Sequence, residues 1–180
     1  MQQAEYVILV NEQDECTGEM EKLAAHEQGL LHRAFSVFIF NSRGEMLLQQ
    51  RSPEKYHSGG LWTNACCSHP RPGESTLAAA TRRLQEEMGF TTAVSSIFDF
   101  IYSAKFENGL TEYEYDHVFA GEYEGPVQVN AAEVAAFAYY GMEDLRQLLQ
   151  AAPQQFTAWF RIAFPKIEEW WKEHYGLRVA

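Results

Sequence analysis

The chain has 180 residues, of which 46% are hydrophobic and 22% are charged, a composition that is typical of one folded domain and unlike that of a disordered protein. Its formal net charge of −11 at pH 7 argues against electrostatic binding of nucleic acid, which requires a basic face. No apolar run approaches the roughly 20 residues that a membrane span requires. We therefore expect neither nucleic acid nor a membrane as a partner.

The three cysteines, Cys16, Cys66 and Cys67, are odd in number and two are adjacent, which makes them a poor framework for disulfides. The N-terminal sequence MQQAEYVILV lacks a basic region and a long apolar run, so we expect no signal peptide. Free thiols are typical of a reducing compartment, and we predict a cytoplasmic protein. Cys16 and Cys66 are expected to be small buried apolar residues.

Short apolar runs predict strands at residues 5–10 and 34–40, and the turn at residues 41–44 predicts a hairpin that returns at residues 45–51. Residues 11–18 are predicted to form a turn, and residues 19–26 a short helix or a surface loop. Residues 52–60 contain a proline and paired glycines and predict a loop.

The clearest helix is predicted at residues 76–88, where Leu77, Ala80, Leu84 and Met88 fall close to one stripe and Gly89 suits the C-cap. Strands are predicted at residues 94–104, 111–121 and 134–140. Helices follow at residues 142–150 and 153–175, with Pro165 as a break or a first-turn residue. This order predicts an α+β fold, or an α/β/α sandwich around a mixed sheet.

The predicted central helix ends in adjacent carboxylates, Glu86 and Glu87, one turn after Arg82 and Arg83. A carboxylate that faces a cleft suits Mg²⁺ with a phosphate ligand. Spacing alone favours a simpler interpretation, a solvated helix face with Arg–Glu pairs at helical intervals. The wider sequence context decides between these interpretations.

That context resembles the signature of the Nudix superfamily, which implies the α/β/α sandwich. Ser68 stands where the signature opens with glycine, and Arg83 stands where the superfamily's hydrolases have a principal metal-binding glutamate. The cation at position 83 argues against simple hydrolysis and favours a relative that binds a diphosphate without cleaving it. The positions that match are Glu74, Arg82, Leu84, Glu86, Glu87, Gly89 and Phe90.

Nearly the whole chain is similar to the type I isopentenyl diphosphate isomerases. The most specific part is the run Trp62-Thr63-Asn64 leading to Cys67-Ser68-His69-Pro70, which we expect to form a loop. The resemblance implies one domain over residues 1–180, with a core at about 31–150, an additional N-terminal segment and a C-terminal helical lid at about 153–175. It also implies interconversion of isopentenyl and dimethylallyl diphosphate. Other residues that carry it are His26, His32, Arg51, Lys55, Glu112, Tyr113 and Glu114.

Five residues are candidate ligands of a metal ion. Glu112 and Glu114 are two apart on a predicted strand, so both carboxylates point to one face. Imidazoles mixed with carboxylates suit Mn²⁺, Zn²⁺ or Fe²⁺ better than Ca²⁺. The imidazole ligands expected in this set are those of His26, His32 and His69, whereas His57, His117 and His174 are expected to be structural.

The resemblance implies further roles for pocket residues. Cys67 and Glu114 are predicted to be the acid–base pair for a reaction through a tertiary carbocation, with Tyr102 as a proton relay and Trp159 facing the cation. Mg²⁺ is expected to bind Glu87, the substrate and the backbone carbonyl of Cys67. The cations predicted to bind the diphosphate are Lys22, Arg51, Lys55 and Arg83.

Two other functions are considered. The first is a Nudix hydrolase of a nucleoside diphosphate derivative, which Arg83 argues against. The second is a Nudix-fold binding protein without catalytic activity, which the complete set of acids, bases and ligands argues against. We expect a monomer, with a dimer as the alternative.

Overall fold

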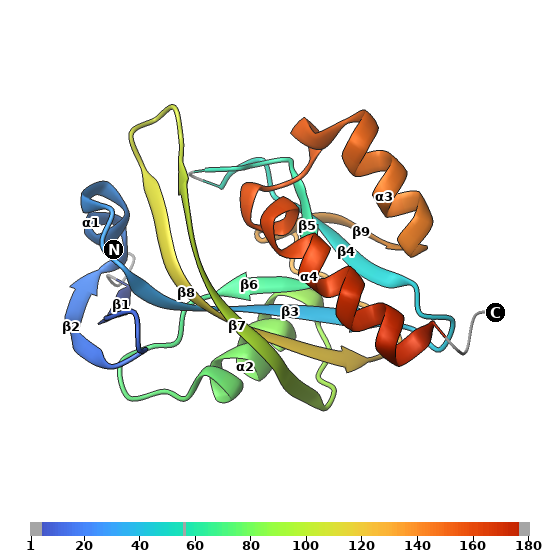
Figure 1. Cartoon of the computed structure of the whole chain (residues 1–180), viewed down its shortest axis with the longest axis horizontal. Helices are drawn as coiled ribbons and strands as arrows, with labels where there is room; N and C mark the ends of the chain where they lie inside the picture. The colour runs from blue at the N-terminus through green and yellow to red at the C-terminus, as the bar shows by residue number, and fades with distance from the viewer. Residues whose placement is uncertain (1–4, 56, 177–180) are drawn as a thin grey trace.

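The computed structural model describes residues 5–55 and 57–176, so the ends of the expected domain, residues 1–4 and 177–180, lie outside the described residues (Figure 1). The described chain forms a nine-stranded sheet with α-helices on both of its faces. No described helix combines the length and the apolar character that crossing a membrane requires. In chain order the elements are β1 (Tyr6–Val10), β2 (Cys16–Glu21), α1 (Lys22–Gln28), β3 (His32–Phe40), β4 (Met46–Arg51), β5 (Trp62–Asn64), β6 (Cys66–Ser68), α2 (Thr76–Met88), β7 (Val94–Lys105), β8 (Thr111–Glu122), β9 (Val134–Tyr140), α3 (Met142–Ala151), a 3₁₀ turn (Pro153–Gln155) and α4 (Ala158–Tyr175).

Strand β3 is the centre of the sheet. It pairs in parallel with β8 and antiparallel with β1, β4 and β6, which makes the sheet mixed. Successive side chains of a strand point to opposite faces. Phe35 and Val37 accordingly pack with α2 on one face, whereas Phe38 and Phe40 pack with α3 and α4 on the other. The layered α+β fold expected from the sequence is therefore confirmed (Figure 1).

Helix α2 has the predicted bounds, and its ends are capped as the sequence suggests. The Ser75 side chain accepts a hydrogen bond from the Ala78 N–H at the N-terminus. Gly89 ends the helix at φ 75°, and a Cβ there would lie 2.2 Å from the carbonyl oxygen of Gln128, so only glycine fits. One member of the predicted apolar stripe, Leu77, is instead 48% exposed in the first turn.

The N-terminal segment differs from its prediction. Residues 16–21 form strand β2 rather than a turn and the start of a helix or loop, because they pair with β1 in an antiparallel hairpin. Helix α1 begins only at Lys22. The expectation that Cys16 is buried is wrong, since its strand lies at the edge of the sheet and the side chain is exposed.

Two further predictions of local structure are corrected. The run from Trp62 to Ser68, expected as a loop, contains the short strands β5 and β6, which pair with β4 and β3. Pro165 neither breaks helix α4 nor lies in its first turn. Burial of the flanking Phe164 and Ile167 against the sheet stabilises the helix through the position where proline lacks an N–H.

Candidate functional site

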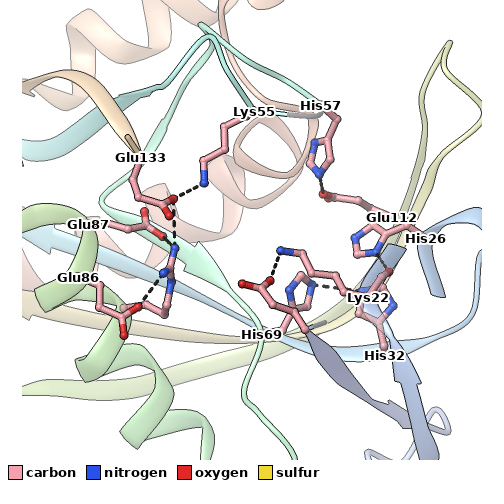
Figure 2. A network of polar contacts seen from close by, with 12 residues as sticks. Lys22, His26, His32, Lys55, His57, His69, Glu86, Glu87, Glu112 and Glu133 are labelled. Carbon is pink, nitrogen blue, oxygen red and sulfur yellow. Dashed lines mark hydrogen bonds and ion pairs between the residues drawn. The ribbon is translucent and has the colours of Figure 1, made fainter. Parts of the chain in front are cut away.

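Three possible metal ligands converge at the start of the central strand, and two of them, His32 and His69, are labelled in Figure 2. His32 opens β3 and pairs in register with Glu114 on β8, and His69 lies directly after β6. The two Nε2 atoms are 3.2 Å apart, and Glu114 Oε1 lies 2.8 Å from that of His69 and 3.5 Å from that of His32. Separations of about 3 Å are those of atoms that share one metal ion at bonds of about 2.1 Å.

His26, from α1, completes this group of four, whose ligand atoms all lie within 4.8 Å of one another. Nδ1 of His26 lies 2.7 Å from the carbonyl oxygen of Lys22, and Nδ1 of His32 lies 2.8 Å from that of Leu30. A carbonyl only accepts hydrogen bonds, so each Nδ1 carries the proton and each Nε2 presents a lone pair. Burial lowers the pKa of His26, and lowers that of His69 to about 4, so both rings are neutral, as metal binding requires. The donors of this cluster fit a divalent metal ion.

A buried tyrosine links the two carboxylates of strand β8. The hydroxyl of Tyr102, on β7, lies 2.7 Å from Glu112 Oε2 and 2.6 Å from Glu114 Oε2. Burial and the neighbouring carboxylate raise the pKa of Glu112 well above its usual range. Burial acts in the same direction on Glu114, but hydrogen bonds to His32 and His69 outweigh it and lower the pKa of Glu114 well below its usual range. Glu112 thus holds a proton more tightly than an ordinary glutamate, and Glu114 holds one less tightly.

His57 belongs to this network, although the sequence indicated only a structural histidine. Its Nε2 lies 3.3 Å from Glu112 Oε1 (Figure 2), and it forms a second possible metal group with His26 and Glu112. Burial, followed by the charge of Arg51, lowers the pKa of His57 to about 3. The ring also stacks on Phe106 at a centroid distance of 5.1 Å.

Cys67, on β6, has a densely hydrogen-bonded thiol. Its Sγ donates to Asn64 Oδ1 at 2.9 Å and accepts from the Trp159 indole N–H at 3.0 Å. The hydroxyl of Ser36 lies 3.7 Å from the same sulfur and donates to Asp116 Oδ2 at 2.7 Å. Burial, followed by the charge of Asp116, raises the pKa of the Cys67 thiol, so the sulfur is protonated at neutral pH.

Trp159 contacts both the Cys67 thiol and Arg51, one of the cations of the pocket. It lies near the start of α4, is almost fully buried, and has the guanidinium of Arg51 over its ring at 5.1 Å from the centroid. An aromatic face attracts positive charge through its quadrupole, by about 0.5–2 kcal/mol. The indole therefore offers a π face and an N–H donor in one pocket.

Helix α2 presents two arginines, each of which pairs with more than one carboxylate. Arg82 makes a bidentate ion pair with Glu74 at 2.7 and 2.8 Å, which ties the loop before the helix to its body. Arg83 pairs with Glu87 at 2.6 Å and with Glu86 at 2.7 Å, and Glu86 also lies 3.3 Å from Arg82. Two of the residues that match the Nudix signature, Glu74 and Arg82, thus form an ion pair with each other.

The catalytic and substrate-binding residues predicted from the sequence line a single pocket. Two predicted metal ligands, His26 and His32, are fully buried and do not line it. The predicted residues along the pocket are Lys22, Arg51, Lys55, Cys67, His69, Arg83, Glu87, Tyr102, Glu112, Glu114 and Trp159.

Several residues around this pocket were not found by sequence reasoning. Asp116 continues the alternation of Glu112 and Glu114 on β8, so the period of two that identified the first two carboxylates extends to it. Ser36 carries no such signal, because its contact with Cys67 depends on strand pairing. Asn64 lies in the motif that identified the family, but its hydrogen bond with Cys67 was not predicted. Cys66 packs in the core against α2, as expected. His174, which was expected to be structural, is exposed, and its Nδ1 lies 2.8 Å from the carbonyl oxygen of Trp170. His117 pairs with Asp14 and Asp99 away from the pocket.

The fold and this site define a protein of the Nudix class. The family model described as NUDIX domain matches residues 30–160. A crystal structure of a Deinococcus radiodurans protein has a TM-score of 0.75 at 18% identity and covers 90% of this chain and 98% of that one. The MutT protein of Methanosarcina mazei has a TM-score of 0.63 at 21% identity, with 77% and 94% of the two chains covered. These similarities establish the fold.

Relatives in sequence define the family more closely. A Pectobacterium atrosepticum protein named isopentenyl-diphosphate Delta-isomerase is 51% identical over 166 residues, which cover 92% of this chain and 93% of that protein. A Burkholderia multivorans protein of the same name is 46% identical over 171 residues, with coverage of 92% and 97%. The chain belongs to the isopentenyl-diphosphate Delta-isomerase family within the Nudix class.

Proposed function

We propose that this protein interconverts isopentenyl diphosphate and dimethylallyl diphosphate in isoprenoid biosynthesis. The observation that carries the proposal is one pocket that combines the Cys67 thiol, the hydrogen-bonded pair of Tyr102 and Glu114, and cationic side chains. An isomerisation of an unactivated alkene needs an acid, a base and an anchor for the diphosphate, and all three chemistries are present.

The diphosphate binds to the cationic side of the pocket. Its proposed ligands are Lys22, Arg51, Lys55 and Arg83. Nε of Arg51 and Nε of Arg83 are both buried and have no hydrogen-bond partner among the described residues, which leaves two N–H donors for phosphate oxygens. Glu87, which is buried beside Arg83, and the backbone carbonyl of Cys67 are the proposed ligands of Mg²⁺ together with the substrate.

The reaction requires the movement of two protons. One of Cys67 and Glu114 gives a proton to the terminal CH₂ carbon of isopentenyl diphosphate, and the double bond becomes a tertiary carbocation. The other takes a proton from the methylene carbon next to the cation, and the new double bond gives dimethylallyl diphosphate. Strands β6 and β8, which carry the two residues, lie on either side of β3, so acid and base approach from separate strands. Tyr102 connects Glu114 with Glu112 for proton relay.

The remaining groups protect and orient this chemistry. The π face of Trp159 stabilises the carbocation without attacking it. A Mn²⁺ or Zn²⁺ ion bound by His26, His32, His69, Glu112 and Glu114 would fix the orientation of Glu114 and adjust its proton affinity. The C-terminal region at about residues 153–175, which contains helix α4, serves as a lid over the pocket and excludes water. Water would otherwise trap the cation as an alcohol.

We further propose a cytoplasmic monomer of one domain, with its core at about residues 31–150.

The test of the function is proton NMR of isopentenyl diphosphate in D₂O with purified protein. Formation of dimethylallyl diphosphate with uptake of deuterium is expected. Release of phosphate from a nucleoside diphosphate derivative, with isopentenyl diphosphate unchanged, would instead establish the hydrolase. Absence of both activities and of a bound transition metal would establish an inactive binding protein.

A further inference from the structure

Glu133 lies where the catalytic pocket opens into a wider outer groove. Lys22, Lys55 and Arg83 line both spaces, whereas Glu133 lines only the groove. Figure 2 shows its carboxylate directed at Lys55. An anionic ligand that reaches Lys55 and Arg83 along the groove therefore also meets the carboxylate of Glu133.

The carboxylate of Glu133 holds two of the cations proposed to bind the diphosphate. It forms an ion pair with Lys55, and its Oε2 lies 3.3 Å from Nη2 of Arg83. These three side chains are 23%, 24% and 18% exposed, so water screens their attraction only in part. Burial opposes ionisation of Glu133, but the hydrogen bond from Lys55 outweighs it and lowers the pKa of Glu133.

Backbone hydrogen bonds fix this arrangement. The N–H of Ser52 donates to the carbonyl oxygen of Glu133 at 2.9 Å, which attaches Glu133 to the loop that carries Lys55. The N–H of Asn130 donates to the carbonyl oxygen of Glu87 at 2.9 Å, which attaches the segment before Glu133 to the end of α2. The position of Glu133 is thus set by the same loops that position its cationic partners.

We propose that Glu133 is a specificity residue that competes with the diphosphate for Lys55 and Arg83. Its single negative charge occupies both cations until a ligand with more charge displaces it, which raises the charge that a ligand needs in order to bind. Arg51 provides a contrast, because among the described residues it makes no ion pair with a carboxylate and lies over Trp159. A ligand must therefore displace Glu133 to bind Lys55 or Arg83, but it displaces no carboxylate of the described residues to bind Arg51.

This inference rests on the proposed diphosphate site, and the test separates the two. Calorimetric titration with inorganic pyrophosphate and Mg²⁺ compares the unmodified protein with Glu133→Gln, which keeps the shape of the side chain and removes its charge. We expect the dissociation constant to fall by about 3- to 10-fold, since an ionic competitor is lost. The KM for isopentenyl diphosphate should fall as well.

The matched control is Glu86→Gln. Glu86 also pairs with Arg83, at 2.7 Å, but it does not line the pocket or the groove. Its removal should change the dissociation constant of pyrophosphate less than about twofold. Unchanged or weaker pyrophosphate binding by Glu133→Gln would overturn the inference while leaving the isomerase intact. Failure of the unmodified protein to convert isopentenyl diphosphate would overturn the proposed function, and the pyrophosphate titration would still report on Glu133.

Discussion

The indole N–H of Trp159 donates to the sulfur of Cys67 over 3.0 Å, which joins the C-terminal helix α4 to strand β6. The two residues are 92 positions apart in the sequence. This contact makes α4 part of the pocket wall, and it places the π face of Trp159 beside a thiol proposed to move a proton. The helix therefore contributes to the site as well as to the core.

Replacement of Trp159 distinguishes its ring from its N–H. Trp159→Phe keeps an aromatic face and should lower kcat by less than about tenfold, whereas Trp159→Ala should lower it at least about tenfold further, since a desolvated cation–π contact contributes 2 kcal/mol or more. Steady-state kinetics with circular dichroism as a check of folding provides the measurement. Equal losses in both variants would show that the ring face does not stabilise the cation.

Removal of either proposed acid–base group should abolish turnover. Cys67→Ala and Glu114→Gln should each lower kcat by at least about 10²- to 10⁴-fold, the usual contribution of one such group. Cys66→Ala is the matched control, because Cys66 packs on the opposite face against α2 and should retain turnover. Near-normal conversion by Cys67→Ala, followed by NMR, would refute its assignment.

Loss of one imidazole should release the transition metal. His69→Gln removes the ring that lies close to both His32 and Glu114, so plasma mass spectrometry should find most of the bound metal lost. The melting temperature should also fall, since an ion that binds only the folded state stabilises it. The control variant His117→Gln changes a histidine outside the pocket, and this variant should keep the bound metal. If both variants retained equal metal, the cluster would not be the binding site.

Introduction of the hydrolase glutamate at position 83 should weaken binding of the diphosphate. Arg83→Glu places a third carboxylate next to Glu86 and Glu87 and removes a diphosphate ligand. We expect KM for isopentenyl diphosphate to rise about 10- to 150-fold, which corresponds to the 1.5–3 kcal/mol of a charged hydrogen bond. The KM of Arg83→Lys should lie between those of the unmodified protein and Arg83→Glu, because lysine keeps the positive charge but loses the forked pair of N–H donors of arginine. An unchanged KM in Arg83→Glu would remove Arg83 from the diphosphate site.

The Glu74–Arg82 pair should stabilise the fold in a manner that depends on pH. Hydrogen bonds from Arg82 lower the pKa of Glu74 below its unfolded value of about 4.3. The stabilisation is therefore present above that pH and is lost as the pH falls through the folded pKa. Urea denaturation should show Glu74→Gln less stable by about 1–2 kcal/mol at pH 7, with a smaller difference near pH 3. A difference independent of pH would mean that ionisation of Glu74 is not responsible.

Periodicity and capping determine much of this protein locally. The alternation of β8 places Glu112 and Glu114 on one face, and the bounds of α2 follow from Ser75, its apolar residues and Gly89. These features depend on residues a few positions apart, whose geometry one chain segment imposes. The sequence motif around Cys67 and His69 likewise identified the family before any tertiary contact was known.

The assembly of the site was decided only by tertiary structure. The pairing of β3 with β8 brings His32 beside Glu114, and its pairing with β6 brings Ser36 beside Cys67, and both registers arise from burial of β3 on two faces. The ion pairs of Glu133 depend in the same way on how its loop packs. Local sequence determines which face a side chain occupies, whereas long-range packing determines which side chains meet there.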